Sequence, residues 1–148
     1  MAEPAVPIGL FVTQRARELS RAFEATLVDA DGSLATWLVL ASLKGGLHQS
    51  QREIADSLGI EGPTLTHHLN RMETAGLVTR TRNPHNRRVH DVTMTTEGER
   101  LFGSLVGVVG GFDRKLRAGF SDEELATLRQ LLQRLADNAT ATRHQPEE

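Results

Sequence analysis

Three arginines surround a turn signal near the middle of the chain. Arg82, Arg87 and Arg88 flank the tetrapeptide NPHN at residues 83–86. Apolar residues alternate with polar ones on both sides, in residues 77–82 and 89–94, which predicts two paired strands with the arginines around their turn. Guanidinium groups stay charged and bind phosphate oxygens through paired hydrogen bonds. The expected chemistry is therefore binding to a polyanion such as duplex DNA.

The distribution of charge supports this expectation better than the total does. The whole chain of 148 residues has a net charge of −2, which by itself does not favour nucleic acid. Residues 62–95 hold five arginines against two carboxylates, a local charge of +3, and four of the six histidines. Residues 118–148 hold six carboxylates against three arginines, a local charge of −3. Binding follows the local field, so the basic middle favours an anionic partner.

Two short helices are expected just before the hairpin. Ser50 followed by Glu53 is a capping box, which predicts a helix that stops at Gly59. Gly62-Pro63 predicts the start of a second helix, ending at Gly76, because proline is tolerated in a first turn. A tight helix pair followed directly by a hairpin is typical of a winged helix-turn-helix. On the second helix, the residues predicted to face outward and contact DNA are Thr64, Thr66, His67, Asn70 and Arg71.

Longer helices are expected around this unit. Apolar spacing predicts helices over residues 7–28, 34–46, 96–117 and 121–138, the second being apolar on all sides and so expected to be buried on all sides. Ser33 is the expected cap of the second, and Ser121 with Glu124 forms a capping box for the last. Thr96 with Glu99 is another capping box, with Thr95 as a rival cap. Several glycines in residues 103–111 predict irregularity there.

The predicted fold is mainly α with a small β-hairpin: a winged helix-turn-helix plus N- and C-terminal dimerisation helices. The expected division is a dimerisation helix in 1–32, a DNA-binding region in 33–95, dimerisation helices in 96–140 and a frayed tail in 141–148, within one compact domain overall. The apolar stripes of the terminal helices are most simply covered by each other and by a second copy. A two-fold homodimer would place two recognition helices about one DNA turn apart, ~34 Å.

The composition excludes several classes of function. The chain has no cysteine, which excludes disulfides, thiolate metal sites and thiol switches. No apolar run approaches the ~20 residues of a membrane span, and the N-terminus lacks a signal pattern, so a soluble cytoplasmic protein with no membrane partner is expected. No nucleotide loop, Ser-His-Asp set or carboxylate pair is readable, so neither an enzyme nor a cofactor is expected.

The histidines of the chain raise the alternative of a metal-binding site. Adjacent His67 and His68 would point ~100° apart on a helix, which makes a joint metal site difficult. A metal-responsive repressor using His48, His68 or other histidines remains an alternative. A second alternative is a winged-helix interaction module that no longer binds an operator, supported by Asn86 in the wing and by the acidic total.

The string REIADSLGIEGPTLTHHLNRMETAGLVTRTRNPHNRRVHDVTMTTEGERL resembles the MarR family of bacterial transcription regulators. The resemblance covers about residues 40–101, and its motifs are IAxxLGI, TLTHHLNRME, AGLVTR, NPxxRR and MTTEG. It implies an obligate homodimer that offers two winged helix-turn-helix units to a pseudo-palindromic operator. It also implies a repressor. Many relatives release DNA when a small, often phenolic or anionic ligand binds to them.

Two residues depart from the family pattern. Relatives often have an aspartate before the paired wing arginines, where this chain has Asn86, so an ion-pair brace would become a neutral hydrogen bond. Many relatives have arginine at the position of His67. For the effector, the residues expected to line a pocket between the dimer region and the reading head are Phe11, Arg15, Trp37 and His68.

Overall fold

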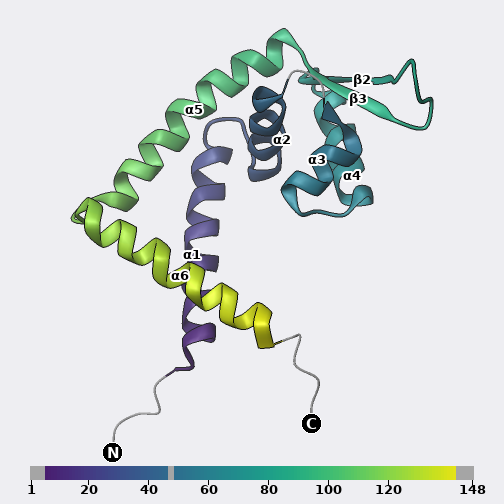
Figure 1. Cartoon of the computed structure of the whole chain (residues 1–148). Helices are drawn as coiled ribbons and strands as arrows, with labels where there is room; N and C mark the ends of the chain where they lie inside the picture. Colours follow the sequence, from purple (N-terminus) through teal and green to yellow (C-terminus); the bar gives the residue numbers. More distant parts are fainter. Residues whose placement is uncertain (1–5, 47–48, 143–148) are drawn as a thin grey trace, which may run out of the picture. The chain divides into compact units, whose positions relative to one another are not determined.

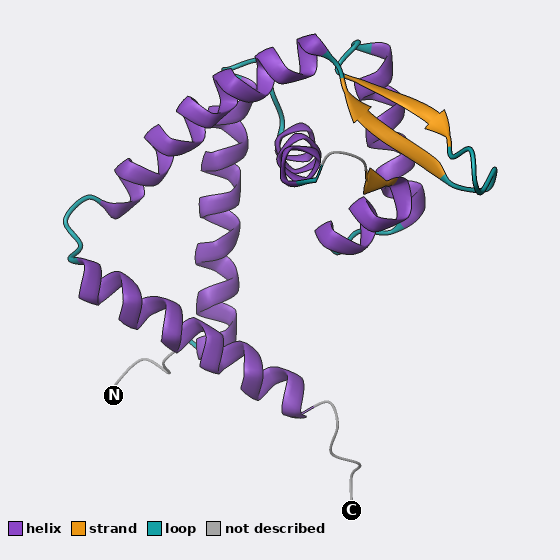
Figure 2. Cartoon of the chain, turned by 45° about the horizontal axis from the view of Figure 1, so that its top comes forward, coloured by secondary structure: helices purple, strands orange, loops and turns teal. Residues whose placement is uncertain are grey.

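The computed structural model describes residues 6–46 and 49–142, and within them the fold is mainly helical with one small sheet (Figures 1 and 2). The elements follow the order α1 (Ile8–Val28), α2 (Leu34–Gly45), β1 (Gln49–Ser50), α3 (Gln51–Leu58), α4 (Gly62–Thr74), β2 (Val78–Arg82), β3 (His90–Met94), α5 (Thr96–Arg117) and α6 (Asp122–Thr142). The predicted fold class, a winged helix-turn-helix with long terminal helices, is confirmed.

The described residues form two compact units. One comprises residues 21–112 and contains the helix-turn-helix and the hairpin; the other comprises the described parts of 1–20 and 113–148. Both boundaries fall inside helices, α1 and α5, so these two helices each contribute to both units. The domain limits predicted at residues 32 and 95 stay predictions.

Local capping residues set the limits of the helix-turn-helix. Ser50 and Glu53 form the complete capping box at the start of α3, as predicted. Gly59 ends α3 in the left-handed conformation, with φ of 64°, where a side chain would be strained. Its successor, Ile60, donates its backbone N–H to the Ala55 carbonyl at 3.1 Å. Pro63 lies in the first turn of α4, also as predicted. The turn between α3 and α4 is therefore fixed by local chemistry.

The hairpin belongs to a three-stranded antiparallel sheet of order β1-β3-β2. β2 and β3 pair in register from Val78 opposite Met94 to Arg82 opposite His90. The sequence did not predict β1, whose Ser50 pairs with Asp91 of β3 and also caps α3. One residue therefore joins the sheet to the first helix of the helix-turn-helix.

A single apolar core holds α4 in place. The fully buried side chains of α4, Leu65 and Leu69, pack with Ile54 of α3 and with Val78 and Val92 of the hairpin. Truncating a leucine at such a site to alanine typically costs about 2–5 kcal/mol of stability. Because the helix pair and the hairpin share this core, the exposed faces of α4 and the wing keep a fixed relation.

The start of α5 packs closely on the turn that follows α4. The hydroxyl of Thr95 accepts the Gly98 backbone N–H at 3.1 Å, so Thr95 caps the helix and the prediction of a Thr96 capping box was wrong. Gly98 is buried, and a Cβ on it would collide with the Leu77 carbonyl. The irregularity predicted from the other glycines does not interrupt α5, which runs continuously over 22 residues.

Two further predictions differ from the structure. α2 begins at the Ser33 cap as expected, but it is buried on one side only: Val39, Leu40 and Leu43 are buried, whereas Leu38 is exposed. α6 begins with the predicted Ser121 capping box and continues to Thr142, beyond the expected end at residue 138. Residues 143–148 of the predicted frayed tail lie outside the described residues. Within residues 6–46 and 49–142, none of the helices combines the length and the apolar character that crossing a bilayer requires.

Candidate nucleic-acid interface

The face of α4 opposite the core carries polar side chains. Leu65, Leu69 and Met72 are buried, and at ~100° per residue the opposite face passes through His67 and Asn70. The exposed candidates predicted on this helix are Thr64, His67, Asn70 and Arg71, whereas Thr66 is half-buried. The helix thus presents a short polar ridge of the size that enters a DNA major groove.

Side-chain amides fix the shape of the wing tip. The Asn83 side-chain oxygen accepts the backbone N–H groups of His85 and Asn86, at 2.9 and 3.2 Å. The Asn86 side-chain oxygen accepts the Arg88 backbone N–H at 3.2 Å. The neutral hydrogen bond expected at Asn86 is therefore present, but it reaches the backbone of Arg88. The turn is held without using a guanidinium group.

The wing arginines are left available for a partner. Arg82, Arg87 and Arg88 are all exposed, and none of them forms an ion pair with a carboxylate of the described residues. By contrast, Arg80 on the same hairpin pairs with Glu73. Unpaired guanidinium groups at an exposed tip are suited to phosphate oxygens, where each contact displaces a condensed counterion.

A cavity of about 760 Å³ connects the helix-turn-helix to the wing. Arg52 of α3, Thr66 of α4, and Asn86 and Arg88 of the wing all line it. α3, α4 and the wing therefore border one concave surface. Asp56 and Glu61 also line it, so a phosphate would be favoured near Arg52 and Arg88 and disfavoured beside the carboxylates.

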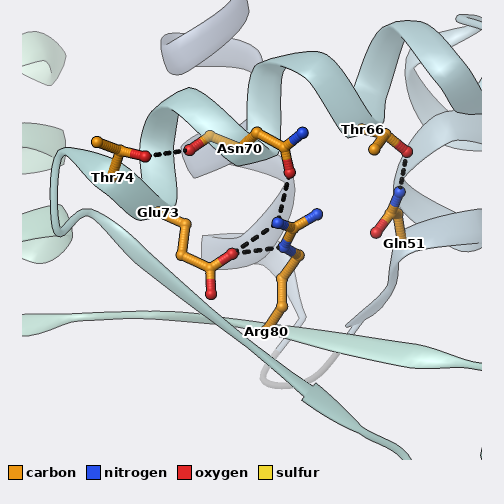
Figure 3. A network of polar contacts seen from close by, with 6 residues as sticks. All are labelled: Gln51, Thr66, Asn70, Glu73, Thr74 and Arg80. Atoms are coloured by element: carbon orange, nitrogen blue, oxygen red, sulfur yellow. Dashed lines mark hydrogen bonds and ion pairs between the residues drawn. The ribbon is translucent and has the colours of Figure 1, made fainter.

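A polar network fixes the side of α4 that faces the hairpin (Figure 3). The Arg80 guanidinium donates from Nε to Glu73 Oε2 at 2.7 Å and from Nη2 to the side-chain oxygen of Asn70. Sequence reasoning missed Arg80 and Glu73. Strand alternation contained the signal, because Arg80 lies two residues after the buried Val78 and so shares its face of the strand.

Thr66 is occupied by a second part of this network. Its hydroxyl donates to the Gly62 carbonyl at 3.0 Å and accepts from the Gln51 side-chain amide of α3 (Figure 3). The single hydroxyl hydrogen is used inside the protein, so Thr66 in this arrangement offers DNA a methyl group and an acceptor but no donor. Its predicted DNA contact stays a prediction with that restriction.

The four predicted effector residues fall in separate surroundings. In one unit the Arg15 guanidinium lies 5.7 Å from the centre of the Phe11 ring and pairs with Glu18 at 2.9 Å. In the other unit the Trp37 ring stacks on Phe102, with centroids 5.5 Å apart. Their grouping with His68 into one pocket stays a prediction.

His68 does line a cavity of its own unit. This cavity of about 330 Å³ has mainly apolar walls and includes Glu24 of α1, Leu34 and Leu38 of α2, and Ile60. The Glu24 carboxylate accepts the Leu34 backbone N–H at 2.8 Å, which ties α1 to the first turn of α2. Sequence reasoning missed Glu24, because the carboxylate and the helix start it binds are ten residues apart.

The adjacent histidines lie beside each other on α4. The ring centroids of His67 and His68 lie 5.9 Å apart with the planes tilted by 57°. Across residues 6–46 and 49–142 no group of three His, Asp or Glu side chains is placed to hold an ion. His48, the other histidine considered for a metal, lies outside the described residues.

The fold, the exposed ridge of α4 and the basic wing define a winged helix-turn-helix protein of the DNA-binding type. Comparisons with known proteins agree with this class. The MarR family model matches residues 33–89. A cysteine-to-serine mutant of MarR from E. coli, crystallised with operator DNA, superimposes with a TM-score of 0.80 at 26% identity, covering 88% of this chain and 94% of that chain. Residues 33–89 thus match the MarR family of transcriptional regulators, and the fold agrees with solved structures of that family over most of the chain.

Other solved structures show the same fold. A MarR-family transcriptional regulator from Rhodococcus sp. has a TM-score of 0.75 at 25% identity, covering 87% of this chain and 91% of that chain. BpsR from Bordetella bronchiseptica, whose DNA binding is regulated by 6-hydroxynicotinic acid, has a TM-score of 0.80 at 20% identity, covering 93% and 98%. The similarity to BpsR concerns the fold alone.

Proposed function

We propose that this protein is a homodimeric, sequence-specific DNA-binding repressor that a small molecule releases from its operator. Each protomer would insert α4 into the major groove of a pseudo-palindromic operator and place the wing against the flanking backbone or minor groove. The DNA contacts would come from Thr64, Thr66, His67, Asn70, Arg71, Arg82, Arg87 and Arg88. It would act in the cytoplasm, where operator DNA is found, and no chemical step is assigned to it.

The observation that carries this proposal is the exposed, unpaired state of the three wing arginines next to the exposed ridge of α4. Arg80, on the same hairpin, is placed against Glu73. Arg82, Arg87 and Arg88 have no such partner among the described residues. The operator complex of the E. coli relative supports duplex DNA as the partner.

Exposed apolar side chains on the terminal helices support the homodimer. Phe120 is 54% exposed, and α6 adds a stripe of Leu128, Leu131, Leu132 and Leu135, each at least 37% exposed. On α1, Ile8, Phe11 and Leu19 are about half exposed. Soluble monomers rarely leave such stripes in water, and a second copy would cover them.

Release by a ligand is supported by the cavity beside His68. It adjoins α1, α2 and the α3–α4 turn, so an occupant would contact both a terminal helix and the helix-turn-helix. A ligand that binds better to a state with the wrong spacing of α4 helices would shift the dimer toward that state. The regulation of BpsR by an aromatic acid makes aromatic acids the first compounds to test.

The test is DNA binding measured over a range of salt concentrations. Full-length protein is titrated into labelled duplexes from the region of its own promoter and into unrelated duplexes of equal length. Specific binding with an affinity that falls steeply with salt is expected for the wild type. Replacing Arg87 and Arg88 together by alanine should weaken binding to all sequences and reduce the slope of log affinity against log salt by about 1.8 per protomer, or about 3.6 for the dimer.

A matched control is the double variant Arg129→Ala, Arg134→Ala on α6, which changes the total charge equally away from the wing. It should retain the wild-type salt slope. Unchanged binding by the wing variant would refute the role of the wing, and equal affinity of the wild type for all duplexes would favour the interaction-module alternative. A zinc-dependent affinity that a chelator abolishes would favour the metal-responsive alternative.

A further inference from the structure

We propose that Asn70 reads its base as a hydrogen-bond donor, and that Arg80 is the positioning residue that makes it so. The base pair opposite Asn70 is therefore expected to present guanine, whose major-groove edge carries two acceptors, and to disfavour adenine. This inference rests on the proposed function, in which α4 enters the major groove.

The orientation of the Asn70 amide is fixed by chemistry. Arg80 Nη2 lies within hydrogen-bonding distance of one side-chain atom of Asn70. A guanidinium group has no acceptor, so the atom that faces it has to be the amide oxygen. The amide nitrogen then points away from Arg80, as Figure 3 shows. Asn70 is exposed, so this nitrogen, with its two hydrogens, is the part of the side chain available to a base.

Arg80 is itself held so that it keeps this contact. Its Nε and Nη2 both lie 2.7 Å from Glu73 Oε2. Its side chain is only 20% exposed, compared with 40% for Glu73. The two hydrogens of Nη2 are divided between Glu73 and Asn70, and charge-assisted bonds of this kind are about twice as strong as neutral ones. The ion pair with Glu73 therefore holds the Arg80 guanidinium where it donates to Asn70.

The major-groove code turns this orientation into a base preference. An asparagine recognises adenine by presenting its oxygen and nitrogen side by side, so that it accepts from N6 and donates to N7. The Asn70 oxygen is directed at Arg80, so both atoms cannot turn to one adenine. The guanidinium beside it also repels the adenine amino group and attracts acceptors. Guanine offers O6 and N7 as acceptors, which suits a donor next to a positive charge.

Binding-site selection from a pool of random duplexes tests this directly. Full-length wild type should enrich a motif with guanine at the position that loses its preference in Asn70→Ala. In Arg80→Met the amide oxygen is released, and adenine should gain at that position relative to guanine by at least about fivefold, the lower end of what a bidentate contact discriminates. Thr79→Ala, an exposed neighbour on β2, is the matched control and should retain the wild-type motif.

A second variant guards against misfolding of Arg80→Met. Glu73→Gln keeps Arg80 but weakens its ion pair, and should shift the same position toward adenine to a smaller extent. Thermal melting followed by circular dichroism establishes which variants are folded. An adenine at the Asn70-dependent position of the wild type, a motif unaffected by Asn70→Ala, or a guanine preference unchanged in every folded variant of Arg80 and Glu73 would overturn the inference. A wild type that enriches no motif would instead refute the proposed function.

Discussion

The hydroxyl of Thr95 donates a hydrogen bond to the backbone carbonyl of Gly76 at 2.6 Å. The same hydroxyl accepts the Gly98 N–H, so one side chain caps α5 and binds the turn that follows α4. The Thr95 backbone N–H adds a hydrogen bond to the Leu77 carbonyl at 3.0 Å. The start of α5 is thereby attached to the turn that follows α4.

Replacing Thr95 by valine should lower the free energy of unfolding by about 1–3 kcal/mol. The change keeps the shape of the side chain but removes the helix cap and leaves the Gly76 carbonyl without its partner. Denaturant unfolding measures the effect. Thr95→Ser retains the hydroxyl and should lose under 1 kcal/mol, or about the value of the missing methyl group. Equal losses in both variants would show that the hydroxyl contributes nothing.

Two glycines of α5 should respond in opposite directions to the same substitution. Gly98→Ala places a methyl against the Leu77 carbonyl and the Met94 side chain, so it should destabilise the protein, by about 1–3 kcal/mol as overpacking does. Gly103→Ala meets open space and should stabilise the helix by up to about 1 kcal/mol. Thermal melting of the two variants beside the wild type measures both signs. A stabilised Gly98→Ala would contradict the close approach of α5 to the turn.

Replacing His67 by arginine should tighten binding to DNA. His67 is exposed on the ridge of α4, and an additional fixed cation there would meet one more phosphate or guanine. The slope of log affinity against log salt should become steeper by about 0.9 per protomer. Gln130→Arg on α6 adds the same charge elsewhere and should leave the slope unchanged. A slope that steepens equally in both variants would mean that only the total charge matters.

Introducing a charge into the leucine stripe of α6 should dissociate the proposed dimer. Leu128 is 46% exposed in the single chain, and Leu128→Asp would bury a carboxylate in a dimer interface without a partner. Light scattering should report the mass of one chain, and operator affinity should fall at least about tenfold because two linked half-sites become independent. Gln130→Asp, on the opposite side of the same helix, should remain dimeric. A dimeric Leu128→Asp would exclude this stripe from the interface.

Local signals in the sequence predicted the helix-turn-helix well. Three features depend only on residues close to them in the sequence: the capping box at Ser50, the left-handed Gly59 and the proline at the start of α4. Each could therefore be predicted without knowing the fold. The family resemblance, which rested on the same stretch, is confirmed by the comparisons.

Features that depend on distant partners were missed. β1 is two residues long and becomes a strand only because β3 passes beside it. The choice between Thr95 and Thr96 as the cap of α5 depends on a carbonyl 19 residues away. The Arg80 network joins residues from a helix and a strand, so alternation could indicate which way Arg80 points but not that Glu73 and Asn70 would meet it.

Ser50 occupies the sheet and the cap of α3 at the same time. α3 is therefore joined to β3 in two ways, through Ser50 and through the apolar core that Ile54 and Val92 share. The hairpin and the helix pair should therefore move together as one rigid body if a bound duplex displaces the wing. Amide hydrogens of β3 and of the first turn of α3 should accordingly open and exchange together.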